Sequence, residues 1–483
     1  MRGLRFLLLL AASVAALLPL APSLPAARAG ESSLDGDLKR VAELRDKGQI
    51  DAAIEIAKGV VEGHPESVEG HVALQDLHLE QGREAAIRAS YQERAKGSAA
   101  TADDHFLYAR LLPERRASPV YRKALRLDPK HYWANCVLGD LETKAGRLDK
   151  AAEHFAIAHE ARPKSSVPLN GLGWVAERRG DVAEAEKYYG LAIDADPDDA
   201  LPRTNLGLLL VGANRIDEAR PVLEAARERS PNDAMILLAL GMADAAAGEI
   251  QAAVKRYEEA SKLPRQTIVS LNVLASTYTG LEQFDLARGV LDRAINEAPE
   301  NETTRFNFAY LELAQGNAAE ALAWVKKILA ADGRSAGAYF LAGLCHESAG
   351  DAKEAERAYK KAVDLDDENP SHHQALAALA GTRGDWRLAL KHHRRAVELT
   401  NDDPDALLDL AFAYAGAGDH RNAAKTFEVV VEKRPDDLVA LMNIGLLYHT
   451  ELRDRDRAIA AYEAYLTKGG KDPRVRAWLD ELR

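Results

Sequence analysis

The residues best suited to chemistry are four histidines in two adjacent pairs, His372–His373 and His392–His393. Neutral imidazole is a common ligand of Zn²⁺ and other transition metals, so metal binding is one chemistry that this cluster could support. Such a site needs three or four ligands, and no Asp, Glu or Cys stands at a convincing completing position. The sequence therefore favours packed imidazoles and predicts no metal ion and no cofactor.

Other motifs that could carry chemistry are weak or missing. Gly171-Leu172-Gly173 is a fragment of a nucleotide-binding glycine motif, but it lies inside a helical pattern with no strand before it. The acidic run Asp366-Asp367-Glu368 lacks the spacing of an EF-hand calcium loop. Neither a Walker-type phosphate loop nor HExxH occurs. We predict no catalytic residues and no enzyme.

Composition and charge exclude several classes of protein. The chain has 47% hydrophobic and 29% charged residues, which is typical of a folded body and not of a disordered one. A net charge of −12 argues against a broad nucleic-acid footprint. Two cysteines in 483 residues exclude a disulfide-stapled scaffold. Stability must therefore come from packing.

The first 29 residues have the order of a secretory signal peptide. Arg2 and Arg5 precede an uncharged apolar run, three prolines follow, and Ala27-Arg28-Ala29 offers small residues for cleavage. An uncleaved membrane anchor is the alternative, which the prolines disfavour. Cleavage near Ala29 leaves 60 basic and 75 acidic residues, hence a net charge of −15. No later segment is apolar enough to span a bilayer, so we expect an exported protein in the periplasm or outside the cell.

The elements that must position these residues repeat every 34 residues. Gly or Ala recurs at this interval ten times, and each of the first nine is followed twelve residues later by Ala. The recurring small residues are Gly139, Gly173, Gly207, Gly241, Ala275, Ala309, Gly343, Ala377, Ala411 and Gly445. One unit, from Ser166, reads as two helices separated by Gly180-Asp181 and ended by Pro197. We predict close helix pairs, with aromatic residues such as Tyr189 filling the space between neighbours.

This pattern resembles the tetratricopeptide repeat, with its small residue at position 8, Gly at 15, Ala at 20, aromatic at 24, Ala at 27 and Pro at 32. The resemblance implies an all-α fold, a right-handed superhelical α-solenoid of about thirteen helix-turn-helix units with a C-terminal capping helix. We expect a signal peptide at 1–29, divergent units at 30–131, a regular array at 132–472 and the cap at 473–483. Gly82 and Ala86 indicate a deletion in the second unit, and Ala458 indicates an insertion around 453–456.

The same resemblance implies where a partner binds. In this family the ligand lies on the concave face, made by positions 2, 5, 9, 12 and 13 of each first helix. The partner-binding residues predicted in this way are mostly apolar: Leu201, Thr204, Leu208, Met235, Leu238, Met242, Phe306, Tyr310, Phe340, Leu344, Leu408, Phe412, Met442 and Leu446. Met and aromatic side chains suit an amphipathic helix or an extended hydrophobic segment. The alternative is that a tight superhelix buries part of this stripe on itself.

Two better-specified family types do not match. A carboxylate clamp needs Lys at position 5 and Asn at 9, where this chain has Leu238 and Met242. An asparagine ladder at position 6 is interrupted by residues such as Val137 and Leu341. We expect a non-catalytic scaffold or assembly factor in the bacterial cell envelope that binds a protein or peptide partner and no nucleic acid. The alternative is a periplasmic chaperone-like holdase or carrier for unfolded or hydrophobic clients.

Overall fold

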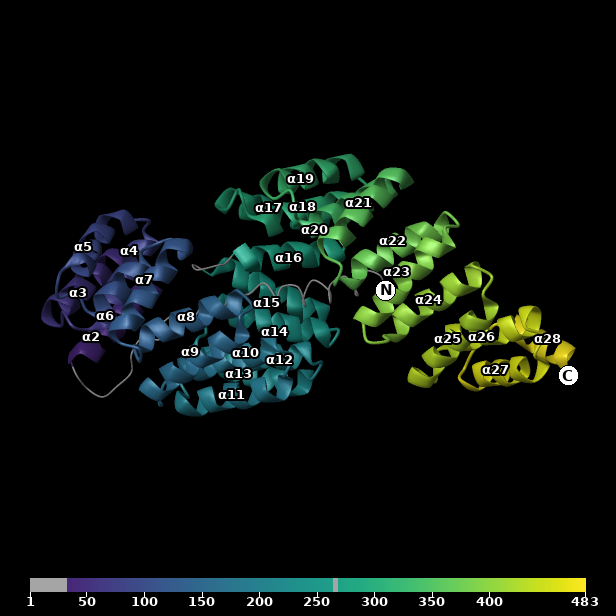
Figure 1. Cartoon of the computed structure of the whole chain (residues 1–483), viewed down its shortest axis with the longest axis horizontal. Coiled ribbons are helices and arrows are strands. Elements are labelled where there is room, and N and C mark those ends of the chain that lie inside the picture. Colours follow the sequence, from purple (N-terminus) through teal and green to yellow (C-terminus); the bar gives the residue numbers. More distant parts are fainter. Residues whose placement is uncertain (1–32, 264–267) are drawn as a thin grey trace. The chain divides into compact units, whose positions relative to one another are not determined.

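The computed structural model describes residues 33–263 and 268–483, and these residues are all-α. Their 27 α-helices form thirteen consecutive pairs followed by a single terminal helix (Figure 1). The first helices of the pairs are α2 (Ser33–Asp46), α4 (Val68–Glu80), α6 (Ala102–Arg110), α8 (Tyr132–Lys144), α10 (Ser166–Arg178), α12 (Ala200–Gly212), α14 (Ala234–Ala246), α16 (Ile268–Gly280), α18 (Glu302–Ala314), α20 (Ala336–Ser348), α22 (Pro370–Thr382), α24 (Pro404–Gly416) and α26 (Leu438–Leu446). The second helices are α3 (Ile50–Gly63), α5 (Glu84–Lys96), α7 (Glu114–Leu127), α9 (Leu148–Ala161), α11 (Val182–Ala195), α13 (Ile216–Arg229), α15 (Ile250–Lys262), α17 (Phe284–Glu297), α19 (Ala318–Ala331), α21 (Ala352–Leu365), α23 (Trp386–Leu399), α25 (His420–Lys433) and α27 (Arg455–Thr467). The predicted solenoid of about thirteen helix pairs is confirmed.

The signal-peptide prediction lies outside the described residues. Among the helices that the structure does describe, none combines the length and the apolarity that a membrane crossing requires.

The chain divides into two compact units at residue 277, within α16. In most pairs the two helices lie side by side, and most second helices also pack on the first helix of the next pair (Figure 1). Residues in contact are therefore close in sequence, as expected for an array in which each repeat contacts its neighbours.

Local signals in the sequence fix the helix ends. The turn inside most pairs has a glycine with positive φ, such as Gly180 (78°) or Gly350 (78°), because a side chain is disfavoured in that conformation. Many first helices begin at a capping side chain, as where Asp233 Oδ1 accepts from the Met235 N–H at 2.8 Å. These signals recur at the repeat interval, so most pairs fold back at the same point.

The small residues of the repeat make room for a large side chain of the same pair. A Cβ atom placed on Gly173 would lie 2.6 Å from the Tyr189 ring, and one on Gly343 would lie 2.3 Å from the Tyr359 ring. Both rings are fully buried, as are the alanines twelve residues after the small residues, such as Ala185. The predicted reason for the small residues, close approach of packed helices, is therefore confirmed.

Two details of the predicted register are wrong. The second pair has full length, and the deletion lies in the third pair, where α6 has only 9 residues against 13 in α4. The insertion predicted around 453–456 lies upstream of that range. The extra residue is taken up by a π-helical turn, η1 (Leu447–Glu451). In both cases the turn also departs from the common pattern, because the third pair has Leu111-Leu112-Pro113 and the last pair has Arg453 (φ 56°) where most pairs have a positive-φ glycine.

The terminal helix α28 (Pro473–Leu482) covers the last pair. Val475 and Leu479 are buried in the final core cluster, and Trp478 stacks on Tyr462 of α27 with ring centroids 5.5 Å apart. This helix is the predicted cap, which end repeats of a solenoid need to cover their apolar side.

Candidate partner-binding surface

All fourteen predicted partner-binding residues lie on first helices. α12 and α14 carry six of them in the unit that ends at Thr277, and α18, α20, α24 and α26 carry eight in the unit Tyr278–Arg483. Their exposure differs strongly from helix to helix, and that exposure decides which of them can meet a partner.

On α12 and α14 half of the predicted residues are buried. Leu238 is 1% exposed and Met242 is 5% exposed. Thr204 is also buried, and its hydroxyl donates to the Ala200 carbonyl at 2.9 Å. Leu201, Leu208 and Met235 are half-buried. This stretch offers little apolar surface in the structure.

On α18 and α20 the predicted residues are half-buried, and their rings also hold neighbouring helices together. The Phe306 ring lies beside Gly337 of α20, where a Cβ would come within 3.3 Å of it. Phe340 lies between Tyr359 of α21 and His372 of α22, at centroid distances of 5.8 and 5.3 Å. These rings fill joints between pairs and leave only part of their surface to solvent.

Tyr310 and Leu344 are half-buried on the same two helices. Burial, and to a smaller degree the nearby Cys345, raises the pKa of the Tyr310 hydroxyl to about 12. The hydroxyl is therefore protonated at neutral pH, which fits a packing side chain.

The most accessible apolar residues of the set lie on α24 and α26. Phe412 is 45% exposed, and its ring is held edge-on against Phe427 at 5.2 Å. Leu408, Met442 and Leu446 are half-buried beside it in the repeat pattern. Val439 of α26 is 50% exposed. We call Leu408, Phe412, Val439, Met442 and Leu446 the α24–α26 face.

Val439 was missed by the sequence prediction, although a signal for it exists. It stands at position 2 of its repeat, one of the positions that the family resemblance points to. Its exposure depends on how α26 meets α24, and the repeat pattern alone does not encode that.

Several titratable groups with shifted pKa values form hydrogen bonds between the two helices of a pair. The Tyr189 hydroxyl donates to Glu177 at 2.7 Å, and the Tyr359 hydroxyl donates to Glu347 at 2.7 Å. Burial raises the pKa of Glu177, and it raises the pKa of both tyrosines. These pairs recur at the same repeat positions, which is the mark of a structural element.

The four histidines singled out in the sequence are all buried. His372 Nδ1 lies 3.1 Å from the Asp366 carbonyl oxygen, and His373 Nδ1 lies 2.8 Å from His392 Nδ1. Across residues 33–263 and 268–483 no three His, Cys, Asp or Glu side chains are grouped as metal ligands. Cys136 and Cys345 are buried and free.

The fold and the repeating small-residue contacts define a helical-repeat protein. Models described as "Tetratricopeptide repeat" match residues 176–243 and 382–443, residues 115–166 and 272–336, and residues 336–369. The chain belongs to the tetratricopeptide repeat superfamily. Repeats of this type are protein-interaction scaffolds, since stacked units present an extended surface.

One curated relative matches locally. Anaphase-promoting complex subunit 3 of Schizosaccharomyces pombe is 38% identical over 63 residues, which are 13% of this chain and 10% of the relative. The chain thus spans a small part of that protein's length.

Two solved structures are similar at low identity. A crystal structure of the APC/C hetero-tetramer Cut9-Hcn1 is 14% identical over 94% of this chain and 96% of the other, with a TM-score of 0.40. A tetratricopeptide repeat protein from Parabacteroides merdae is 18% identical over 51% of this chain and 98% of the other, with a TM-score of 0.42. These scores are too low to carry the geometry or the function of either structure over to this chain.

Proposed function

We propose that the protein is a non-catalytic scaffold that is exported to the cell envelope and holds a protein partner on the α24–α26 face. The observation that carries this proposal is the exposure of Phe412 and Val439 among half-buried Leu408, Met442 and Leu446 on two consecutive first helices. Surface apolar residues in a contiguous group are typical of interaction sites. An amphipathic helix or a short hydrophobic segment is the partner chemistry that fits.

The absence of a predicted catalytic centre supports the non-catalytic part of the proposal. The perturbed tyrosine and glutamate groups already described are engaged within helix pairs, and His372, His373 and His392 contact one another or backbone carbonyls. The matched relative is named as a subunit of a complex, and a scaffold role agrees with that name.

Export is supported by the residue pattern at 1–29. The basic start, the apolar run and the small residues before Gly30 are together typical of a secretory signal. Mass spectrometry of the protein recovered from its native cell should show a new N-terminus near Gly30, and an intact Met1 would contradict export with cleavage.

The function is tested by capturing partners with purified chain carrying Phe412→Glu. We expect one stoichiometric partner on the unmodified chain and its loss in this variant, because a charge on the face is costly to desolvate. The matched control is Leu286→Glu, on the second helix α17 of the same unit, where the side chain is 53% exposed. This control should retain the partner.

The other outcomes separate the alternatives. If the chain captures a broad set of unrelated clients and suppresses the aggregation of several unfolded proteins, its function is that of a holdase and not of a scaffold. A partner that both variants retain would move the binding site away from the α24–α26 face.

A further inference from the structure

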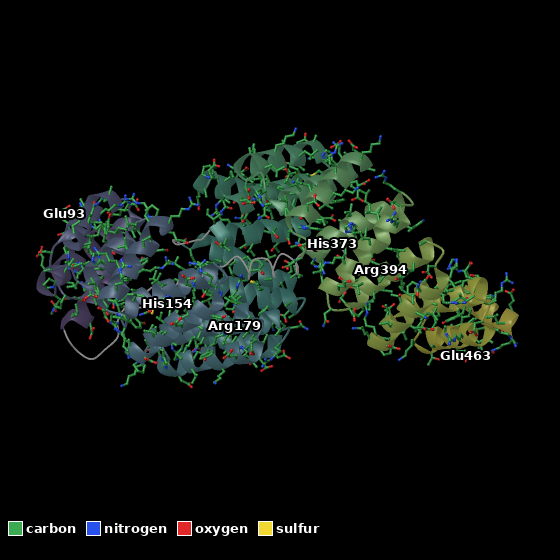
Figure 2. All side chains as sticks on the ribbon, in the orientation of Figure 1. Glu93, His154, Arg179, His373, Arg394 and Glu463 are labelled. Atoms are coloured by element: carbon green, nitrogen blue, oxygen red, sulfur yellow. The ribbon has the colours of Figure 1, made fainter. Side chains whose placement is uncertain are left out.

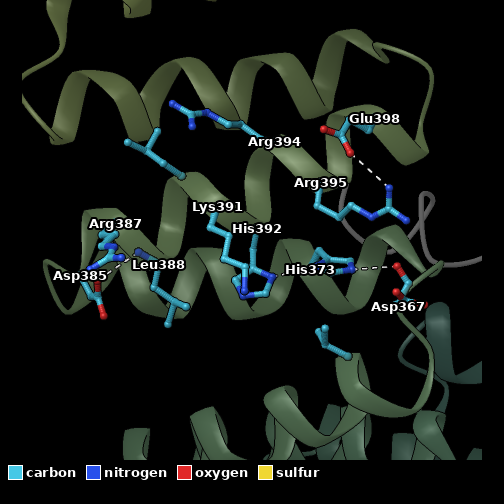
Figure 3. Close-up of a pocket in the computed structure, with 12 residues that line it drawn as sticks. Asp367, His373, Asp385, Arg387, Leu388, Lys391, His392, Arg394, Arg395 and Glu398 are labelled. Atoms are coloured by element: carbon cyan, nitrogen blue, oxygen red, sulfur yellow. Dashed lines mark hydrogen bonds and ion pairs between the residues drawn. The ribbon is translucent and has the colours of Figure 1, made fainter.

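A pocket of about 930 Å³ lies between second helices of neighbouring pairs in the unit Tyr278–Arg483. α23 lines most of it, and Val363 of α21, His373 of α22 and the loop residues Asp367 and Asp385 complete the lining (Figure 3). His373 of α22 and Arg394 of α23 are labelled in Figure 2. The α24–α26 face belongs to first helices, so the pocket is a separate surface.

Cations line the pocket along one side of α23. Arg387, Lys391 and Arg395 follow one another at intervals of four residues, with Arg394 next to the last. α23 has four basic residues and one acidic residue, Glu398. Like charges one helical turn apart destabilise a helix unless an opposite charge is near.

Among the described residues, only Arg395 of these four cations has an ion pair. Arg395 pairs with Glu398 at 3.2 Å, and Arg394 Nε donates to the Tyr414 hydroxyl at 3.1 Å. For Arg387 and Lys391, no ion pair or hydrogen bond to another described side chain exists, and both side chains are exposed.

The pocket also contains carboxylates. Asp385 caps α23 by accepting from the Leu388 N–H at 3.1 Å, and Glu398 is paired with Arg395. Asp367 is exposed in the loop before α22. The positive charge without an ion pair on the α23 side is therefore that of Arg387, Lys391 and Arg394, of which Arg394 is hydrogen-bonded to the neutral Tyr414 hydroxyl.

The histidine contacts fix which imidazole nitrogen faces a ligand. His373 Nε2 lies 3.0 Å from the Asp367 carbonyl oxygen, which can only accept, so this nitrogen carries the proton. His373 Nδ1 is then an acceptor, and His392 Nδ1 donates to it at 2.8 Å. His392 Nε2 is left as an unprotonated acceptor without a partner among the described residues, on a side chain that lines the pocket.

The spacing of these groups distinguishes between ligands. Arg387, Lys391 and Arg395 follow one another at about 6 Å and span about 12 Å of helix. In an extended peptide, side chains at alternate positions are about 6.6 Å apart and lie on one side. A single small anion cannot reach all three cations, and a fully ionised one has no N–H for His392 Nε2.

We propose that this pocket binds an extended acidic peptide segment of a partner protein, with carboxylates at alternate positions facing α23 and one backbone N–H donated to His392 Nε2. Charge complementarity and spacing select this occupant. The site does not depend on the α24–α26 face, so either proposal can fail while the other stands.

The test uses the full chain after its first 29 residues and a fluorescein-labelled peptide of five Glu-Ser repeats, followed by fluorescence anisotropy at low ionic strength. We expect saturable binding that weakens with salt, and none with peptides of Gln-Ser or Lys-Ser repeats. Arg387→Glu combined with Lys391→Glu should weaken binding by about tenfold or more, because two attractions become repulsions.

The matched control is Arg421→Glu combined with Lys425→Glu on α25. These residues are exposed, have the same spacing, and stand one repeat of 34 residues further along. We expect this variant to bind like the unmodified chain, and both variants should melt at the same temperature because all four side chains are at the surface.

His392→Phe tests the acceptor nitrogen. This substitution should weaken binding of the Glu-Ser peptide by several-fold, because it removes one hydrogen-bond acceptor. The salt dependence of binding should stay unchanged, because no charge is removed. An equal loss in both charge-reversal variants, or equal binding of the Gln-Ser peptide, would overturn the proposal. Full displacement of the peptide by inorganic phosphate or free glutamate at equal charge concentration would reassign the pocket to small anions and also overturn it.

Discussion

Helices α14 and α24 occupy the same place in their repeats and bury different amounts of the same positions. Leu238 and Leu408 both stand at position 5, and Met242 and Phe412 both stand at position 9. On α14 these residues are 1% and 5% exposed, whereas Leu408 is half-buried and Phe412 is 45% exposed. A repeat position thus fixes the direction of a side chain but not its accessibility.

The sequences of the two helices explain part of this difference. α14 is apolar on all sides apart from Asp244, and a helix of this kind is expected to be buried all round. Asp244 itself is buried and is bound by Arg256 at 2.7 Å and Arg220 at 3.1 Å. α24 carries Asp405 and Asp409 and leaves one side in water. α14 is therefore covered by its neighbours, whereas α24 leaves apolar groups exposed.

The largest effect is expected for a charge placed at position 9 of each helix. Met242→Glu should destabilise the region around α14 by about 3–5 kcal/mol, because it buries a carboxylate without a partner. Phe412→Glu should cost about 1 kcal/mol, because part of the ring is buried against Phe427 while the new carboxylate stays in water. Hydrogen exchange on α14 and α24 measures both, since long arrays need not unfold in two states. If both substitutions reduce the hydrogen-exchange protection of their helices equally, the proposed difference in burial between α14 and α24 is wrong.

A smaller difference is expected from truncation at position 5. Leu238→Ala should cost about 2–5 kcal/mol because it leaves a cavity, and Leu408→Ala about 1 kcal/mol because its side chain is already half in water. Urea denaturation monitored by hydrogen exchange in each helix gives the two values. If Leu408→Ala costs as much as Leu238→Ala, then α24 is as closed as α14.

Acid should loosen α22 and α23 before α14 and α15, whose sequences contain no histidine. Burial, and then the nearby charge of His373, lowers the pKa of His392 from 6.5 to about 4, and burial lowers that of His393 to about 4. The unfolded chain therefore binds more protons between these pH values, and stability falls as pH drops from 6.5 to about 4. His393→Phe should reduce this loss. Hydrogen exchange measured as a function of pH gives the local stability of both regions. If the stability of α22–α23 and that of α14–α15 fall equally with pH, this prediction is contradicted.

The smallest effect is expected for Val439→Thr, which exchanges one exposed methyl group for a hydroxyl on the α24–α26 face. Partner affinity should fall by about fourfold, which corresponds to one buried methylene-sized group. Val182→Thr is the control, because Val182 is 39% exposed on the second helix α11 of the other unit. Titration of the captured partner gives both affinities, and equal values would remove Val439 from the face.

Most of the fold could be predicted because its information is local. The residue types at Gly180, Ala185 and Tyr189 recur at the same positions in most units, so one unit predicts the others. The capping helix with Val475 and Leu479 follows from helical spacing. The deletion in α6 and the π-helical turn at Leu447–Glu451 could not be placed, because both pairs lack the glycine that marks the turn in most other pairs. The candidate surface was predicted only as a direction. Which of its residues are exposed depends on how neighbouring helices cover them, as Leu238 and Leu408 show.

The most direct test of the central claim is photo-cross-linking in the native cell from benzoylphenylalanine placed at position 412, with position 286 as the control. Phe412 and Leu286 are similarly exposed in the same unit, on a first and a second helix respectively. The scaffold proposed here predicts one dominant cross-linked protein from position 412 and none from position 286. No cross-link from position 412, or the same protein from both positions, would contradict it.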